Sequence, residues 1–122
     1  MFSDFSTSLA ALAAVALAGC ATDPAPNEQL RLTRQALEQA SAVGAVAEES
    51  AELKLAEDKF ARAEVDMADQ SYKDARMQAE QAELDARLAE AQVLTRKSQE
   101  QLNVLNTRIT RLRKQLQLGE AQ

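Results

Sequence analysis

The chain has 122 residues, a net charge of −5 and a hydrophobic fraction of 46%, which limit it to one domain with a small core. It contains one Cys and no His or Trp, which excludes an internal disulfide, a zinc or haem site and a Cys–His nucleophile. Ala, Leu, Glu, Gln, Arg and Lys dominate the sequence, a composition typical of long helices and coiled coils.

An apolar run near the start of the chain, residues 9–17, leads into Leu17-Ala18-Gly19-Cys20. The run is too short to cross a bilayer, which takes about 20 apolar residues, and it has the length of the apolar part of an export signal. The four residues resemble the lipobox of bacterial lipoproteins. The resemblance implies that residues 1–19 are a signal peptide, that cleavage falls between Gly19 and Cys20, and that Cys20 carries diacylglycerol and a further acyl chain such as palmitate.

The residues on either side of this signal bear on where the protein is located. Residues 1–8 contain Asp4 and no Lys or Arg, whereas export signals normally begin with positive charge. Ala21 follows the cysteine, and in the lipoprotein family an acidic residue at that position favours retention in the inner membrane. The resemblance therefore implies a protein of the outer membrane that faces the periplasm. The alternative is an ordinary secretory signal, which would leave Cys20 as a free thiol.

A short tether and a first helix are predicted after the signal. Residues 20–27 contain two prolines, which disfavour helix and keep the segment extended. The first helix is expected over residues 28–43, with Asn27 as its N-cap. Gly44 fits the C′ position, because glycine enters the left-handed region without steric cost. We expect this helix at the end of the hairpin away from the C-terminal apolar seam described below, and the alternative is that it folds back over part of that seam.

A second helix is predicted over residues 50–69, with Ser50 as its N-cap. Apolar residues recur along it at alternating spacings of three and four, which places them on one face of a helix. These residues are Leu53, Ala56, Phe60, Ala63 and Met67.

A third helix is predicted over residues 71–118, with Ser71 and Asp74 as a capping-box pair and Gly119 as its end. A short turn before it makes the second and third helices antiparallel neighbours. Its apolar stripe is small, and Leu53, Phe60, Met67 and Tyr72 are expected to pack the hairpin. The stripe consists of Tyr72, Ala75, Ala79, Ala82, Ala86, Ala89 and Val93.

The C-terminal part of the third helix carries a second apolar seam. A second helix of about 20 residues cannot cover a third helix of about 45 residues, which extends about 65 Å. We therefore expect the seam to pair with a partner helix, and self-association as a coiled coil is the favoured prediction. The seam consists of Leu102, Leu105, Ile109, Leu112 and Leu116. Traced backwards it weakens through Ser98, Thr95, Ala91, Leu88 and Leu84. The predicted fold is thus all-α, an antiparallel hairpin of two to three helices whose long C-terminal helix extends as a coiled coil.

The charges are unevenly distributed along the chain. Residues 21–95 carry 16 acidic and 8 basic side chains, whereas residues 96–122 carry 6 basic and 2 acidic ones. Cations near a helix C-terminus complement the helix dipole, and this is the simpler interpretation. A basic end that contacts an anionic surface of phospholipid, lipopolysaccharide or peptidoglycan is the alternative.

Neither a catalytic nor a nucleic-acid site is indicated. Carboxylates pair at Glu57-Asp58, Glu64-Asp66 and Glu80-Glu83. A carboxylate catalyst needs a walled pocket, which a small helical array does not offer, so these groups are interpreted as solvated faces. Basic residues are not interleaved with aromatic ones, which argues against nucleic-acid binding. We expect no enzymatic activity, metal or cofactor.

Three segments together resemble a family of bacterial envelope proteins, the domain of unknown function 4398. They are residues 52–63, 71–76 and 79–91, within a similarity that covers Ala36 to Gln99. Family members are often lipoproteins, and some precede an OmpA-type peptidoglycan-binding domain. Here Ser50 stands where the family often has a proline, and no OmpA-type sequence is present.

The favoured hypothesis is a lipid-anchored envelope protein with a structural, adaptor or scaffold role. Its expected partners are the membrane, through the lipid, and itself or another envelope protein, through the coiled coil. One alternative is a peptidoglycan-associated tether of the Braun type, although that family ends in Lys and this sequence ends in Ala121-Gln122. The other is a periplasmic holdase-like chaperone that uses the exposed seam.

Overall fold

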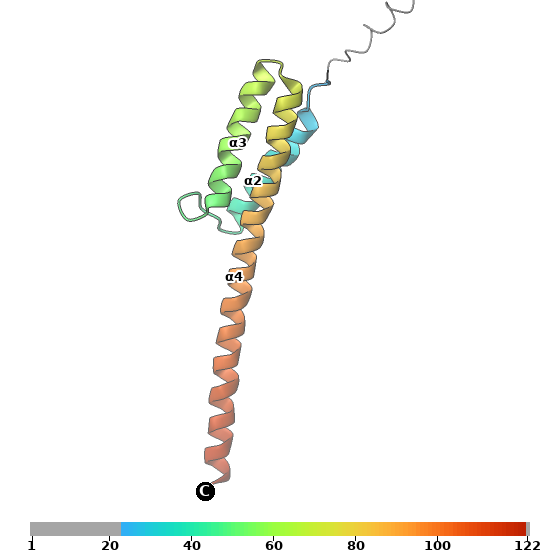
Figure 1. Ribbon diagram of the computed structural model, residues 1–122. Coiled ribbons are helices and arrows are strands. Elements are labelled where there is room, and N and C mark those ends of the chain that lie inside the picture. Colours follow the sequence, from blue (N-terminus) through green and yellow to red (C-terminus); the bar gives the residue numbers. More distant parts are fainter. Residues whose placement is uncertain (1–22, 122) are drawn as a thin grey trace, which may run out of the picture.

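The computed structural model describes residues 23–121, and this part of the chain is all-helical without strands (Figure 1). Helix α2 spans Asn27–Ala42, α3 spans Ala51–Ala68 and α4 spans Tyr72–Glu120. The predicted all-α hairpin with a long C-terminal helix is confirmed, and each helix boundary lies one or two residues from its expected position. The predicted signal peptide, with Gly19 and Cys20, lies outside the described residues.

The three helices pack together along the first half of α4 (Figure 1). Helix α3 runs antiparallel to α4 and is joined to it by residues 69–71. Helix α2 runs in the same direction as α4: Thr33 donates its hydroxyl to the Ala79 carbonyl at 2.9 Å, and Lys97 Nζ donates to the Val43 carbonyl at 2.7 Å. The first helix therefore packs along the first half of α4 and leaves the C-terminal seam uncovered.

The core is built from small side chains at the predicted spacing of three and four. A close approach of helix axes is possible because alanine projects only one methyl group. On α4 the buried residues are Ala75, Ala79, Ala82, Ala86, Ala89 and Val93. They face Thr33, Ala36 and Ala40 of α2 and Leu53, Ala56 and Ala63 of α3. Leu53 and Thr33 are the largest fully buried side chains among the described residues.

The four residues expected to pack the hairpin occupy two different environments. Leu53 is buried in the core, whereas Phe60, Met67 and Tyr72 are half-buried at its margin. Phe60 lies under the Arg34 guanidinium, whose carbon is 5.4 Å from the ring centroid, so the ring contributes to the edge between α3 and α2. The alanine core is too tight to admit these larger rings and chains.

The two ends of α2 differ in how well the sequence predicted them. Pro26, and not Asn27, holds the N-cap position, because its carbonyl accepts the first helical hydrogen bond from Leu30 N at 3.0 Å. Asn27 is already helical. At the other end Gly44 has φ +98°, the left-handed conformation expected after a helix.

Caps at the other helix ends follow the backbone conformation. Ser50 is extended (φ −118°, ψ 109°) and its hydroxyl accepts from Leu53 N at 3.2 Å, as predicted. Ser71 has ψ 61°, and within residues 23–121 its side chain makes no capping hydrogen bond, so the capping box with Asp74 was a wrong prediction. Gly119 does not end α4, which continues to Glu120 because this glycine keeps negative φ.

The alanine core makes a direct prediction for Ala86, which is fully buried between Ala36 and Ala56. Ala86→Leu should lower the free energy of unfolding by about 1–3 kcal/mol, because the added carbon atoms force the helices apart. Ala61→Leu, at an exposed position of α3, should change it by less than about 0.5 kcal/mol. Urea unfolding followed by circular dichroism measures both, and equal effects would contradict close packing at Ala86.

Candidate functional site

The second half of α4 extends beyond the other helices as a single helix (Figure 1). Every described residue from Leu94 onward is exposed. Lys97 Nζ donates a hydrogen bond to the carbonyl of Val43, the C-cap residue of α2. From residue 98 to Glu120 the helix has 23 residues, which corresponds to about 35 Å.

The predicted seam lies on this single helix and is exposed along its whole length. The exposed fractions of its five residues run from 45% at Ile109 to 70% at Leu116. Large apolar side chains aligned on one face of a helix, without cover, mark an interaction surface. The structure thus brings Leu102, Leu105, Ile109, Leu112 and Leu116 onto one uncovered face, and within the described residues nothing packs on them.

The same face continues toward the N-terminal end of α4, along the part of the helix that belongs to the three-helix bundle. Leu84 is 67% exposed and Leu88 is 48% exposed, although both lie beside the packed part of α4. They stand two positions after the buried Ala82 and Ala86, a rotation of about 200°, which places them on the opposite side of α4. We call the ten residues of this face the outer stripe: Leu84, Leu88, Ala91, Thr95, Ser98, Leu102, Leu105, Ile109, Leu112 and Leu116.

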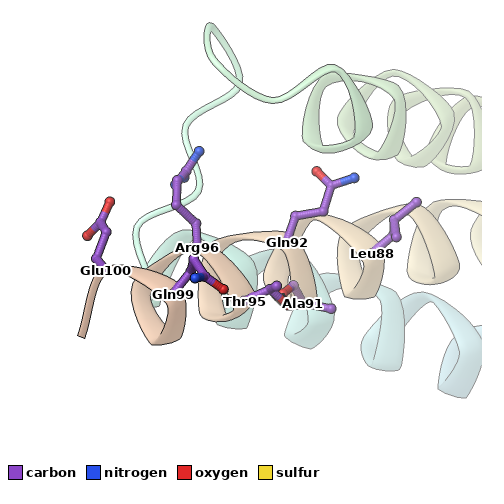
Figure 2. Close-up of a pocket in the computed structure, with 7 residues that line it drawn as sticks. All are labelled: Leu88, Ala91, Gln92, Thr95, Arg96, Gln99 and Glu100. Atoms are coloured by element: carbon purple, nitrogen blue, oxygen red, sulfur yellow. The ribbon is translucent and has the colours of Figure 1, made fainter. Parts of the chain in front are cut away.

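A shallow groove lies in the middle of the outer stripe, where the stripe contains the small residues Ala91 and Thr95 (Figure 2). The groove is open to solvent and has a volume of about 570 Å³. Figure 2 shows Gln92 and Arg96 rising from α4 toward the segment between α2 and α3. The lining residues are Leu88, Ala91, Gln92, Thr95, Arg96, Gln99 and Glu100. Sequence reasoning missed the groove, because only the structure shows that Leu88, Ala91 and Thr95 are left exposed by α2 and α3.

Polar contacts on the other sides of α4 hold the bundle together. Gln29 Nε2 donates to Glu83 Oε2 at 2.7 Å, and Arg87 Nη2 donates to Glu83 Oε1 at 2.6 Å. Arg87, followed by Gln29, lowers the pKa of the Glu83 carboxyl, because both hydrogen bonds favour its charged form. Lys59 Nζ pairs with Asp85 Oδ2 at 2.6 Å and joins α3 to α4.

The carboxylates noted in the sequence do not gather into a site. Glu57, Asp58, Glu64 and Glu80 are exposed, and Glu64 pairs with Arg34 of α2 at 2.9 Å. Across residues 23–121 no cluster of three or more His, Cys, Asp or Glu side chains could hold a metal ion. Within the same range, no helix combines the length and the apolarity that crossing a membrane requires.

The fold defines the class of this protein as a small three-helix bundle that is extended by one long helix. The chain belongs to the family described as domain of unknown function (DUF4398), whose model matches residues 28–105. The structure is similar to the crystal structure of a DUF4398 family protein from Pseudomonas aeruginosa PAO1, with 63% sequence identity and a TM-score of 0.74. The similarity covers 81% of this chain and 100% of that chain. Among curated proteins, none matches this chain.

The Glu83 contacts predict a pH dependence of stability. A carboxyl whose pKa is lowered by folding contributes stability that is present above its unfolded pKa, about 4.3, and is lost as the pH falls through the folded pKa. Between about pH 5 and pH 3, Glu83→Gln should therefore lose less unfolding free energy than the unmodified protein. Urea unfolding at several pH values measures the slope. Glu80→Gln controls for the loss of one charge on the same helix, and identical slopes for Glu83→Gln and the unmodified protein would contradict this role.

Proposed function

We propose that the protein is a lipid-anchored component of the bacterial cell envelope with a structural role, as a scaffold or adaptor, and without catalytic activity. It faces the periplasm from the outer membrane and presents the outer stripe of α4 to a partner helix. The sequence contains no His and a single Cys, placed at the end of the lipobox-like segment. The role therefore depends on attachment and on a surface, and not on reactive groups.

The observation that carries this proposal is the uncovered half of α4. An isolated helix in water is marginally stable, and most helical stability in proteins comes from packing of an apolar face. Here 23 helical residues extend past the bundle with Leu and Ile at alternating spacings of three and four. This spacing is the pattern that pairs helices in coiled coils. A partner helix would supply the packing that the chain itself does not.

The geometry of the bundle supports separate places for anchor and partner. Arg76 Nη2, near the start of α4, donates to the Pro24 carbonyl at 3.3 Å. The described chain therefore enters the bundle at the end opposite the tip of α4, and Cys20 stands three residues before Asp23. The start of the described chain, which follows the proposed lipid site by three residues in sequence, and the tip of α4 lie at opposite ends of the described molecule. Three acyl chains exceed the two signals that stable membrane attachment takes.

Cys20→Ala tests the anchor. It should move the protein from the outer-membrane fraction to the soluble periplasmic fraction, because the thiol that receives the lipid is gone. Fractionation and mass spectrometry of the mature chain measure location and modification. Thr22→Ala, two residues away, should leave both unchanged. A Cys20→Ala variant that still sediments with the outer membrane, or native protein with an unmodified Cys20, would refute lipid anchoring.

Leu105→Asp combined with Leu112→Asp tests the surface. The pair should abolish binding of the partner helix, because each carboxylate would be buried without a counter-charge. Asn103→Asp with Thr110→Asp adds the same charge at the same spacing on another face, and binding should persist. Crosslinking and pull-down of the intact protein measure partner capture. Equal capture by both variants would contradict the surface, and a polydisperse, client-dependent species would indicate a holdase instead.

A further inference from the structure

We infer that the occupant of the outer stripe is a second copy of this chain, paired antiparallel along the whole stripe from Leu84 to Leu116. The inference rests on the proposed function and names the partner of its surface. It uses three properties of the stripe: its length, the order of its large and small residues, and the charges beside it.

The length of the stripe favours pairing that reaches past the bundle. The five seam residues span 15 positions, about two heptads, whereas a stable coiled coil takes about three to four. The outer stripe has ten positions over 33 residues, which amounts to nearly five heptads and about 48 Å. Leu84 and Leu88 remain exposed beside the bundle, so a second helix can lie along the full stripe without displacing α2 or α3.

The order of residue sizes selects the antiparallel direction. When the two ends of the stripe meet, each small residue of one copy faces a large residue of the other. The five kinds of layer are Leu84–Leu116, Leu88–Leu112, Ala91–Ile109, Thr95–Leu105 and Ser98–Leu102. Every layer then contains at least one Leu or Ile. In a parallel pair in register, Ala91, Thr95 and Ser98 would face their own copies, and three consecutive layers would lack a large side chain.

The open groove lies where this pairing needs room. Its lining includes Ala91 and Thr95, the two small residues that would face Ile109 and Leu105 of the second copy. The longer polar side chains Gln92 and Gln99 also line it. Large aliphatic side chains entering such a hollow are the knobs-into-holes contacts of paired helices. The groove of about 570 Å³ is thus filled by the lower half of the other stripe.

The charges favour the same direction. Residues 23–95 carry 16 acidic and 8 basic side chains, and residues 96–121 carry 6 basic and 2 acidic ones. Antiparallel pairing places the basic half of each α4 beside the acidic bundle of the other copy, whereas parallel pairing places the basic halves together. In heptad positions, Arg113 flanks Asp85 of the second copy in the antiparallel pair, and that carboxylate also pairs with Lys59 of its own α3. In the parallel pair Arg108 flanks Arg113 of the second copy. Charges beside the seam set the orientation of coiled coils.

Two single-cysteine variants test both the partner and the direction. Leu84→Cys and Leu116→Cys are made separately in the full-length chain carrying Cys20→Ser, where both sites are exposed and the bundle is left intact. Each variant is oxidised alone and as an equal mixture, and non-reducing gels detect dimers. We expect disulfide-linked dimers in the mixture and none with either variant alone, because only residues 84 and 116 face each other. Glu90→Cys mixed with Thr110→Cys, which lie off the stripe, should give none.

The other outcomes overturn the inference. Dimers from each variant alone would show parallel pairing. A monomer by sedimentation equilibrium, with no disulfide in any sample, would show that a second copy is not the occupant. Neither result would remove the envelope role, which is tested independently by the membrane fractionation of Cys20→Ala and by partner capture. Loss of membrane attachment in Cys20→Ala together with the expected disulfide pattern would support both, whereas an unmodified native Cys20 with that pattern would refute the anchor alone.

Discussion

The close approach of α2 and α3 to an alanine face of α4 is the constraint on which the rest of the structure depends. Ala75, Ala79, Ala82, Ala86 and Ala89 have no exposed surface, and a larger side chain at these positions would separate the helices. Such a core buries little apolar surface per residue, so specific polar contacts between helices matter more. Thr33 shows this: its buried hydroxyl is satisfied by the carbonyls of Gln29 and Ala79 at 2.9 Å each.

Helix α4 is therefore a shared element with two apolar faces on opposite sides. The inner face, made of alanine, is closed by the chain's own α2 and α3. The outer face, made mainly of leucine, is left uncovered by the described residues and runs from Leu84 to Leu116. Small residues suit the side where two helices must fit closely within one chain, and large ones suit a side that meets one partner helix.

The sequence predicted the periodic features of the fold and missed those set by tertiary contacts. The alternating spacing of the alanines fixed the buried face, and Gly44 and Ser50 fixed two helix ends, because their conformations are local. The cap at Ser71 failed because its hydroxyl can reach the helix only from an extended backbone, and the tight turn before α4 holds another conformation. The course of α2 along α4 could not be predicted, since its contacts depend on residues such as Ala79 and Lys97 far along the chain.

The candidate surface was predicted in part. The five seam residues stood out because Leu and Ile recur without interruption from Leu102. Its upper half was harder to recognise, because Ala91, Thr95 and Ser98 weaken the apolar pattern and the same segment also carries the buried alanines. Only the arrangement of the three helices shows which of the two overlapping patterns faces solvent. Gly19 and Cys20, on which the proposed membrane attachment depends, lie outside the described residues, and the lipobox resemblance is what supports their role.

The parallel course of α2 and α4 has a consequence for how a pair of these molecules would sit on a bilayer. The described chain begins beside the start of α4, where Arg76 donates to the Pro24 carbonyl, so an antiparallel pair would place these two starting points at its far ends, about 84 Å apart. If both chains were anchored near these points, as proposed, the antiparallel dimer would lie flat along the membrane surface. A parallel pair would instead have both attachment points at the same end and would extend away from the membrane. Because each chain begins beside the start of α4, the direction of pairing decides whether such a dimer would lie along the membrane or reach away from it.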